Sequence, residues 1–216
     1  LAGMASLGAK TAFIGKVSDD QLGSIFVHDM HSVGVHFSTP SATGGVATAI
    51  CLVFVTPDAQ RTMGTYIGAC TLLSETDIDD QIIEHAAVTY IEGYLWDTEN
   101  AKAAIRKAIG IAKKHGRKIA FTLSDVFCVD RHRQEFLDLI KNDLDILFAN
   151  EAELKSLYQT KDIDEALSLV RGACPIAAVT RSEQGSIVLT ARAVEVAPAR
   201  KIAQIIDTTG AGDLYA

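Results

Sequence analysis

The chain has 216 residues, of which 48% are hydrophobic and 22% are charged, and its formal net charge is −7. This composition is typical of a globular protein with a full hydrophobic core and excludes a disordered chain. No apolar stretch approaches the ~20 residues that a membrane-spanning helix needs. Nucleic acids and anionic membranes are bound through clustered Lys and Arg, so an acidic chain without a long basic block is expected to bind neither.

The cysteine spacing indicates a reducing compartment. The four cysteines are far apart and include no C-x-x-C pair, so neither a zinc site nor a disulfide framework is expected. We therefore expect a cytoplasmic protein with free thiols at Cys51, Cys70, Cys128 and Cys174.

The N-terminal part of the chain predicts a helix end, a strand and a second helix. Residues 1–8 are typical of the last turns of an apolar helix that ends at Gly8. A β-rich run covers residues 11–17. Apolar residues at helical spacing then predict a helix that stops near Gly34.

Residues 36–67 differ in character from the rest of the chain. β-branched runs on either side of a turn at 57–60 predict a hairpin or small sheet. We interpret this segment as a β lid on an α/β core made of residues 1–35 and 68–216.

Strands and helices alternate from residue 84 onward, and the first of these helices has Asp97 or Thr98 as its N-cap. The expected strands cover 86–93, 118–123, 145–149, 176–180, 185–190, 193–198 and 202–207, and the expected helices cover 97–116, 130–142, 150–159 and 162–173. This alternation predicts an α/β fold with a mainly parallel central sheet covered by helices on both faces. The closely spaced last three strands predict antiparallel additions at one edge.

The segment DTTGAGD, residues 207–213, is the strongest candidate site. Gly210 and Gly212 allow backbone shapes that point successive N–H groups at one spot, where a helix begins. Such a site favours an anion, for example a phosphate. Asp213 is close enough to accept a proton from a hydroxyl that attacks this phosphate. The alternative is a tight turn in which Asp213 only stabilises the helix start.

DTTGAGD resembles the C-terminal signature of the ribokinase-like (PfkB) family of sugar and nucleoside kinases. Further segments are similar to that family in the same order: GAKTAFIGKVSDDQLG, NEAE and VTRSEQGSIV. The segments most similar to the adenosine-kinase branch are VTPDAQRTMGTYIGA, YIEGYL, FTLSDVF and DILFANEAEL. The resemblance covers nearly the whole chain. It implies a three-layer αβα ribokinase-like fold with a small β-sheet lid, and it implies ATP and Mg²⁺ as cofactors.

The resemblance also implies catalytic roles at the end of the chain. Asp213 would be the general base that takes the proton from the acceptor hydroxyl. Gly210, Ala211 and Gly212 would form the anion hole for the transferring γ-phosphoryl group.

The nucleotide site implied by the resemblance uses residues at other strand ends. Asn150 and Glu153 would organise magnesium, its waters and the phosphates. Thr180, Gly185 and Thr208 would contact ATP. Asn150 and Glu153 also have the spacing of a capping box, which needs no metal, and the two roles are compatible.

Two further residues are candidate substrate contacts. Arg61, in the lid, would reach the acceptor or the phosphate on closure, or it is merely solvated after the Pro57–Asp58 turn. Glu92 lies where ribokinases place a sugar-binding acid, although adenosine kinases can carry an apolar residue there.

The chain departs from the family at its ends and in the lid. The N-terminal Gly-Gly-Asn region, the Asp that usually binds substrate hydroxyls and the elements that close over the adenine are not in it, so we interpret it as incomplete at both ends. Residues 42–50 follow the Thr-Gly-Thr pattern of the adenosine-kinase branch only loosely. The acceptor therefore stays open.

The leading hypothesis is an ATP-dependent kinase that phosphorylates the primary hydroxyl of a ribonucleoside or sugar. Adenosine is the favoured acceptor, and ribokinase- or fructokinase-type sugars are the alternative. A noncatalytic nucleoside- or sugar-binding protein of the same fold is a second hypothesis, against which the intact Asp213 argues. A dinucleotide enzyme fits poorly, because the glycine run ends the α/β series and lacks G-x-G-x-x-G. The expected partner is the small-molecule acceptor, with the protein a monomer or homodimer.

Overall fold

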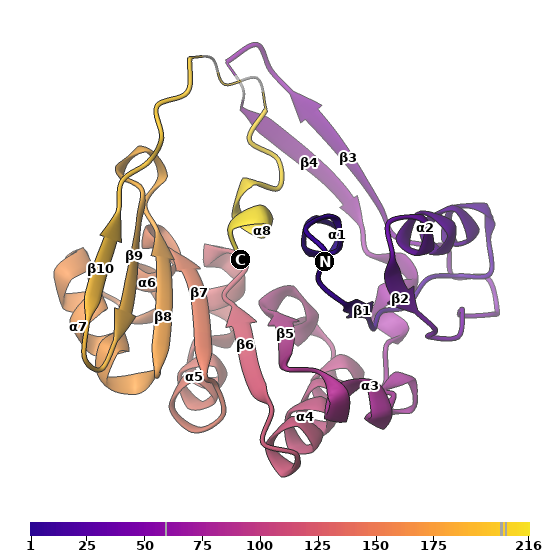
Figure 1. The fold of residues 1–216 in the computed structure, drawn as a ribbon. Coiled ribbons are helices and arrows are strands. Elements are labelled where there is room, and N and C mark those ends of the chain that lie inside the picture. The colour runs from indigo at the N-terminus through magenta and orange to yellow at the C-terminus, as the bar shows by residue number, and fades with distance from the viewer. Residues whose placement is uncertain (59, 204, 206) are drawn as a thin grey trace. The chain divides into compact units, whose positions relative to one another are not determined.

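The computed structural model describes residues 1–58, 60–203, 205 and 207–216 (Figure 1). The chain forms two compact units. Unit 1 comprises Leu1–Ile82, Thr98–Lys107 and Gln204–Tyr215, and unit 2 comprises Ile83–Asp97, Ala108–Ala203 and Ala216. No helix in the described part of the chain is long and apolar enough to cross a membrane.

Unit 1 contains two small sheets and several short helices. A parallel sheet pairs β1 (Thr11–Phe13) with β2 (Val35–Phe37), and α2 (Gln21–Ser32) connects these strands. The other elements with residues in unit 1 are α1 (Ala2–Ser6), β3 (Ile50–Val55), β4 (Arg61–Tyr66), η1 (Gly68–Leu72), η2 (Glu75–Asp77), α3 (Asp80–His85), α4 (Glu99–Lys114) and α8 (Ala211–Tyr215). Of these, α3 and α4 also contribute residues to unit 2.

Local signals explain where the first helices begin and end. Gly8 has a φ of +89°, which glycine adopts easily, and it donates to the Ala5 carbonyl (2.8 Å) to close α1. The Asp20 carboxylate accepts a hydrogen bond from the Gly23 N–H (2.8 Å) and so caps α2. Gly34 follows the end of α2 with a φ of +85°. Both helices predicted for this part of the chain are confirmed.

β3 and β4 form the predicted antiparallel hairpin (Figure 1). The Thr56 N–H donates to the Gln60 carbonyl (2.9 Å) across the turn, and Ala59 lies outside the described residues. Every side chain of both strands is exposed. The limits expected for lid and core, at residues 36–67, stay a prediction.

Unit 2 is built on a six-stranded sheet in the order β10-β9-β8-β7-β6-β5. β5 to β8 run parallel, and β9 and β10 are antiparallel additions at one edge. The strands are β5 (Val88–Glu92), β6 (Lys118–Thr122), β7 (Ile146–Asn150), β8 (Ile176–Thr180), β9 (Ser186–Thr190) and β10 (Val194–Ala197). The predicted α/β class with a mainly parallel sheet is confirmed.

The helices of unit 2 follow the strands as predicted. α5 (Val126–Asn142), α6 (Glu151–Leu157) and α7 (Ile163–Ala173) pack side by side, and α6 and α7 also lie against β7, β8 and β9. The short 3-10 helix η3 (Gly93–Asp97) follows β5, and η4 (Ser182–Gln184) lies between β8 and β9.

The alternative N-caps of α4 are resolved in favour of Thr98. The Ala101 N–H donates to the Thr98 hydroxyl (3.3 Å). Asp97 instead accepts hydrogen bonds from Arg131 (2.9 and 3.0 Å) and from the His132 ring (2.7 Å). The carboxylate at this position therefore binds two side chains of α5.

Three aromatic rings form the centre of unit 2. Trp96, Phe121 and Phe136 are each at most 1% exposed, and their ring centroids lie 5.0–6.4 Å apart in edge-on arrangements. Burying one large apolar side chain stabilises a fold by roughly 1.5–3 kcal/mol. The Trp96 ring N–H donates to Glu135 (2.8 Å), so burial leaves its polar atom satisfied.

Two predicted strands differ from the structure. β5 is present, but among its residues only Ile91 is buried, because in the part of the chain that the structure describes β5 is the last strand of its sheet. The strand predicted at 202–207 is not found at Ile202, Ala203, Ile205 or Asp207, and Gln204 and Ile206 lie outside the described residues. Apolar composition alone does not make a strand, because a strand also needs a neighbour to satisfy its backbone groups.

Candidate active site

The ends of the parallel strands in unit 2 bring three predicted site residues to one edge of the sheet. Glu92 ends β5, Asn150 ends β7 and Thr180 ends β8. The strand register pairs Asn150 with Thr180, and Glu92 with Thr122. Ligands of α/β sheets bind outside such carboxyl ends, so this edge is a candidate binding site.

Asn150 and Glu153 form a capping box at the start of α6. The Asn150 Oδ1 accepts from the Glu153 N–H (2.9 Å), and the Glu153 carboxylate accepts from the Asn150 N–H (2.9 Å). A further hydrogen bond joins the Asn150 side-chain amide to the other Glu153 oxygen (2.6 Å). The capping box, which needs no metal, is therefore present in this structure, and it fixes both side chains at the sheet edge.

Glu153 is buried, with 5% of the residue exposed. Burial raises its pKa, the hydrogen bond from the Asn150 N–H opposes this shift, and the nearby Asp125 carboxylate adds to it. Glu153 thus holds its proton to a higher pH than an exposed glutamate. A cation bound nearby would favour the ionised carboxylate and so lower the pKa of Glu153.

The oxygen atoms of Asn150 and Glu153 are ligands of the kind that Mg²⁺ takes. Each Glu153 oxygen accepts one hydrogen bond, and a carboxylate has about four acceptor positions, so positions remain for an ion or its waters. Within the described ranges, no group of three or more His, Cys, Asp or Glu side chains could hold a metal. The pair therefore fits an ion held mainly by waters and phosphates.

Gly185 closes the turn between β8 and β9. Its φ is +86°, and its carbonyl accepts a hydrogen bond from the Arg181 N–H (2.7 Å). A Cβ at this position would lie 2.0 Å from the Ala197 carbonyl oxygen. Only glycine fits this close backbone approach, which gives the residue a packing role beside its predicted contact with ATP.

At the same edge a hydrogen-bonded pair joins Ser124, which follows the strand predicted at 118–123, to Tyr94, which was not among the predicted site residues. The Tyr94 N–H donates to the Ser124 hydroxyl (3.2 Å), and the Tyr94 hydroxyl donates to the Ser124 carbonyl (3.3 Å). Burial and the neighbouring Asp125 raise the pKa of Tyr94 to about 12, so the hydroxyl remains a donor at neutral pH. Ser124 follows a predicted strand, which is a signal in the sequence, whereas Tyr94 follows the glycine after β5 and carries no such signal.

In unit 1, the Gly210–Asp213 segment forms a turn that opens α8. Gly210 has a φ of +73°, and the Leu214 N–H donates to its carbonyl (2.9 Å). The Ala211 N–H donates to the Thr208 carbonyl (3.2 Å), so this amide stabilises the turn. The Asp213 carboxylate lies 3.8 Å from the position of a Cβ on Gly210. The carboxylate therefore folds back over the glycine turn, where a side chain would reduce the space.

Arg61 of the hairpin reaches the same segment. Its guanidinium donates to the Thr208 hydroxyl (2.8 Å). Next to it, Asp207 accepts from the Thr209 hydroxyl (2.7 Å) and N–H (2.8 Å). These bonds lower the pKa of Asp207, and the Arg61 charge adds to the effect. The structure thus brings together the predicted lid cation and the predicted catalytic turn.

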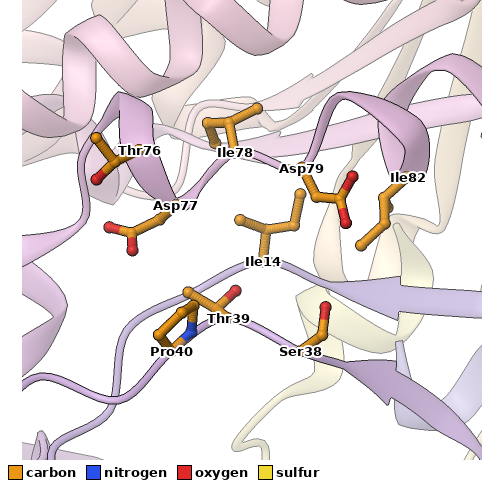
Figure 2. A pocket seen from close by; sticks show the side chains of 9 residues that line it. All are labelled: Ile14, Ser38, Thr39, Pro40, Thr76, Asp77, Ile78, Asp79 and Ile82. Carbon is orange, nitrogen blue, oxygen red and sulfur yellow. The ribbon is translucent and has the colours of Figure 1, made fainter.

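A cavity of about 210 Å³ in unit 1 lies apart from these residues (Figure 2). It is lined by Ile14 and by residues 38–40 and 76–79, with Ile82 at its side. Its Asp77 carboxylate is 5% exposed and pairs with Lys16 (2.5 Å), so this charge is already balanced. None of the predicted site residues lines the cavity.

The predicted site residues divide between the two units. Unit 1 holds Arg61, Thr208, Gly210, Ala211, Gly212 and Asp213, and unit 2 holds Glu92, Asn150, Glu153, Thr180 and Gly185. Asn150 in unit 2 and the Gly210–Asp213 turn in unit 1 lie where a helix begins. That placement suits an anionic ligand with phosphate groups.

Known carbohydrate kinases are similar to this chain over its whole length. The model of the pfkB family carbohydrate kinases matches residues 1–216. Fructokinase-1 of Oryza sativa subsp. japonica is 27% identical over 220 residues, which cover 98% of this chain and 68% of that protein. The 5-dehydro-2-deoxygluconokinase of Geobacillus kaustophilus (strain HTA426) is 26% identical, with 99% and 67% covered.

Two solved structures are more similar in sequence. The adenosine kinase from Sinorhizobium meliloti is 51% identical, with a TM-score of 0.96, over 99% of this chain and 66% of that one. A probable sugar kinase protein from Rhizobium etli CFN 42 is 49% identical, with a TM-score of 0.97, over 99% and 65%. The chain thus spans about two thirds of the length of these relatives, and the predicted ribokinase-like fold is confirmed. Their names divide between a nucleoside and sugars as the acceptor.

Proposed function

Because this chain belongs to the pfkB family of carbohydrate kinases, we propose that the protein transfers the γ-phosphoryl group of ATP to the primary hydroxyl of a ribonucleoside or sugar. The single observation that carries the proposal is the Gly210–Asp213 turn, where a carboxylate folds back over a glycine at the start of α8. A noncatalytic binding protein would need neither the carboxylate nor the open turn.

Asp213 is proposed as the general base. It is exposed, so an acceptor hydroxyl can reach it, and its carboxylate is held beside the turn that would receive the phosphate. Removing the hydroxyl proton as the new bond to phosphorus forms makes the acceptor oxygen a better nucleophile. The proton passes to the Asp213 carboxylate, and ADP leaves.

The charge of the transferring phosphoryl group would be stabilised from two sides in unit 1. The backbone N–H groups of Gly210 and Gly212 lie at the start of α8 and are proposed to face the phosphate, while the Ala211 N–H is used within the turn. Arg61 adds a cation from the hairpin, next to Thr208. Phosphoryl transfer depends largely on such positioned positive charge. The hairpin would act as a lid that excludes water, which otherwise competes with the acceptor.

ATP would bind at the carboxyl edge of the sheet in unit 2. Thr180 and the tight turn at Gly185 are proposed to contact the nucleotide there. Asn150 and Glu153 would hold the waters of a magnesium ion, which when bound neutralises charge on the β- and γ-phosphates. A kinase that draws on cellular ATP is consistent with the predicted cytoplasmic location.

Adenosine is the proposed acceptor. Its support is the 51% identity with the adenosine kinase from Sinorhizobium meliloti. A sugar is the second candidate, because the Rhizobium etli protein described as a probable sugar kinase is 49% identical. Glu92 favours this alternative, since an acid at the end of β5 suits sugar hydroxyls.

The test is ADP release by the full-length protein with adenosine, ribose and fructose as acceptors. Asp213→Asn should lower kcat about a hundredfold to ten-thousandfold, the usual range for a lost general base, and leave the thermal unfolding midpoint unchanged. Asp29→Asn, an exposed carboxylate on α2, is the matched control and should retain wild-type turnover. Near-normal turnover by Asp213→Asn would overturn the assignment of the base. Tight acceptor binding without ADP release would favour a binding protein.

A further inference from the structure

The hairpin is attached to the rest of unit 1 by a small hydrogen-bonded cluster at its first strand. Thr48 lies two residues before β3, and its side chain is buried, with the residue 6% exposed. Its hydroxyl accepts from the Ser18 N–H (2.9 Å) and donates to Asp20 (2.7 Å). The Thr48 N–H donates to the second Asp20 oxygen (2.8 Å). One carboxylate thus binds both the backbone and the side chain of Thr48.

The same carboxylate also holds the start of α2. Asp20 also caps α2 through the Gly23 N–H (2.8 Å). A Cβ on Gly23 would lie 2.0 Å from the Ser18 carbonyl oxygen, so only glycine fits at this position next to the Asp20 cap. The hydrogen bonds from Thr48, followed by the one from Gly23, lower the pKa of Asp20. The carboxylate is therefore an ionised anchor at neutral pH.

The return strand is held to the same point. The Ala69 N–H, three residues after β4, donates to the Ala47 carbonyl (2.9 Å). Gly68 approaches this carbonyl so closely that a Cβ would lie 2.3 Å from it. Both ends of the hairpin therefore meet at residues 47–48. Among the described hydrogen bonds, those to the Asp20 side chain are the ones that connect this point to α2.

Small changes at this anchor are magnified at Arg61. β3 and β4 have six residues each, and Arg61 pairs with Val55 at the far end. Six residues of strand measure about 20 Å, so a tilt of about ten degrees at the anchor displaces Arg61 by about 3 Å. A displacement of that size breaks the 2.8 Å hydrogen bond between Arg61 and Thr208.

We propose that Asp20, acting through Thr48, is a positioning residue that sets the angle of the hairpin and thereby the approach of Arg61 to the catalytic turn. The proposal rests on the proposed function only for its effect on turnover. Asp20 touches neither nucleotide nor acceptor in this scheme.

The test is a double-mutant cycle in the full-length protein. Thr48→Val removes the hydroxyl at nearly constant volume and should lower kcat about tenfold when Arg61 is present. In the Arg61→Ala background the same change should have an effect of less than about twofold, because the residue that the anchor positions is gone. Equal effects in both backgrounds would show a merely structural role and overturn the proposal.

Controls separate this effect from general destabilisation. Thr11→Val makes the same replacement in β1 of unit 1, at a buried hydroxyl for which the described residues offer no hydrogen-bond partner, and it should leave kcat unchanged. Thr48→Ser keeps the hydroxyl and should restore turnover. If Thr48→Val does not fold, Asp20→Asn removes only the bond to the Thr48 N–H and enters the same cycle.

Hydrogen exchange tests the Asp20–Thr48 anchor without relying on kinase activity. Hydrogen exchange of residues 50–66 should be faster in Thr48→Val than in Thr11→Val. That result supports the anchor even if the wild-type protein releases no ADP with any acceptor. Identical exchange in the two variants would overturn the anchor even in an active kinase.

Discussion

The Glu153 carboxylate accepts one hydrogen bond on each oxygen, both from Asn150. The residue that would organise a magnesium ion is therefore oriented by the same contacts that begin α6. Such an arrangement costs no reorganisation when a ligand arrives, because the side chain is already fixed. It also buries an ionisable group that binds its proton more tightly than usual.

That buried carboxyl group should leave a pH signature on stability. Because its folded pKa is raised, the native state binds the Glu153 proton more tightly than the unfolded chain. The free energy of unfolding should therefore fall as pH rises from the ordinary glutamate pKa, about 4.3, to the raised folded value. Glu153→Gln cannot ionise, so urea unfolding of this variant without nucleotide should show a flatter pH profile in that window.

The control for this measurement is Glu183→Gln, an exposed glutamate in the turn after β8. It should keep the slope of the wild-type protein. A Glu153→Gln variant with the same slope as wild type would contradict the raised pKa. The loss of one hydrogen bond to Asn150 lowers stability at every pH and does not change the slope.

At the scale of elements, the alternation of strands and helices after residue 84 could be predicted because apolar residues are spaced differently in strands and in helices. β6 to β8 are continuous apolar runs, as buried parallel strands require, and each ends at a polar residue. The capping pair at Asn150 and the strand-end position of Thr180 follow from the same pattern. The shared sheet edge of these residues is therefore predictable from the amino-acid sequence alone.

The strand predicted at 202–207 and the start predicted for α5 differ from the described structure for separate reasons. Residues 202–207 are as apolar as a buried strand, yet Ile202 and Ile205 are 71% and 56% exposed. α5 begins at Val126 rather than residue 130, because Asp125 accepts from the Cys128 N–H (2.5 Å) and caps an extra turn. The hydrogen bond between Thr48 and Asp20 could not be predicted from the sequence, because the two residues are 28 positions apart in the chain.

The turn between β8 and β9 gives a prediction about glycine. Gly185→Ala adds a Cβ at a φ of +86° and 2.0 Å from the Ala197 carbonyl, so the β8–β9 turn or the segment after β10 must move. The expected loss in the free energy of unfolding is about 3 kcal/mol. Gly172→Ala, in α7 with nothing within 4 Å of the added Cβ, is the matched control and should gain about 0.5–1 kcal/mol. Urea unfolding of both variants measures the difference, and equal stabilities would contradict the close approach.

At the scale of the whole molecule, the two units carry complementary parts of the proposed chemistry. Unit 1 holds the proposed base, the glycine turn and Arg61, while unit 2 holds the proposed nucleotide contacts at its strand ends. In unit 1 the hairpin carries Arg61, which donates to Thr208 beside the glycine turn, so closure of this element is the ordering step that the proposed function requires.

The hairpin is the element in which that ordering can be measured. All side chains of β3 and β4 are exposed, and an isolated two-stranded hairpin is marginally stable in water. Adenosine together with a nonhydrolysable ATP analogue and Mg²⁺ should slow hydrogen exchange of residues 50–66 in the full-length protein, because closure would bury one face of the hairpin. Arg61→Ala should lose most of this protection, since it lacks the bond to Thr208, whereas Thr11→Val should keep it. Exchange that stays the same with and without the three ligands would contradict the assignment of the hairpin as a lid.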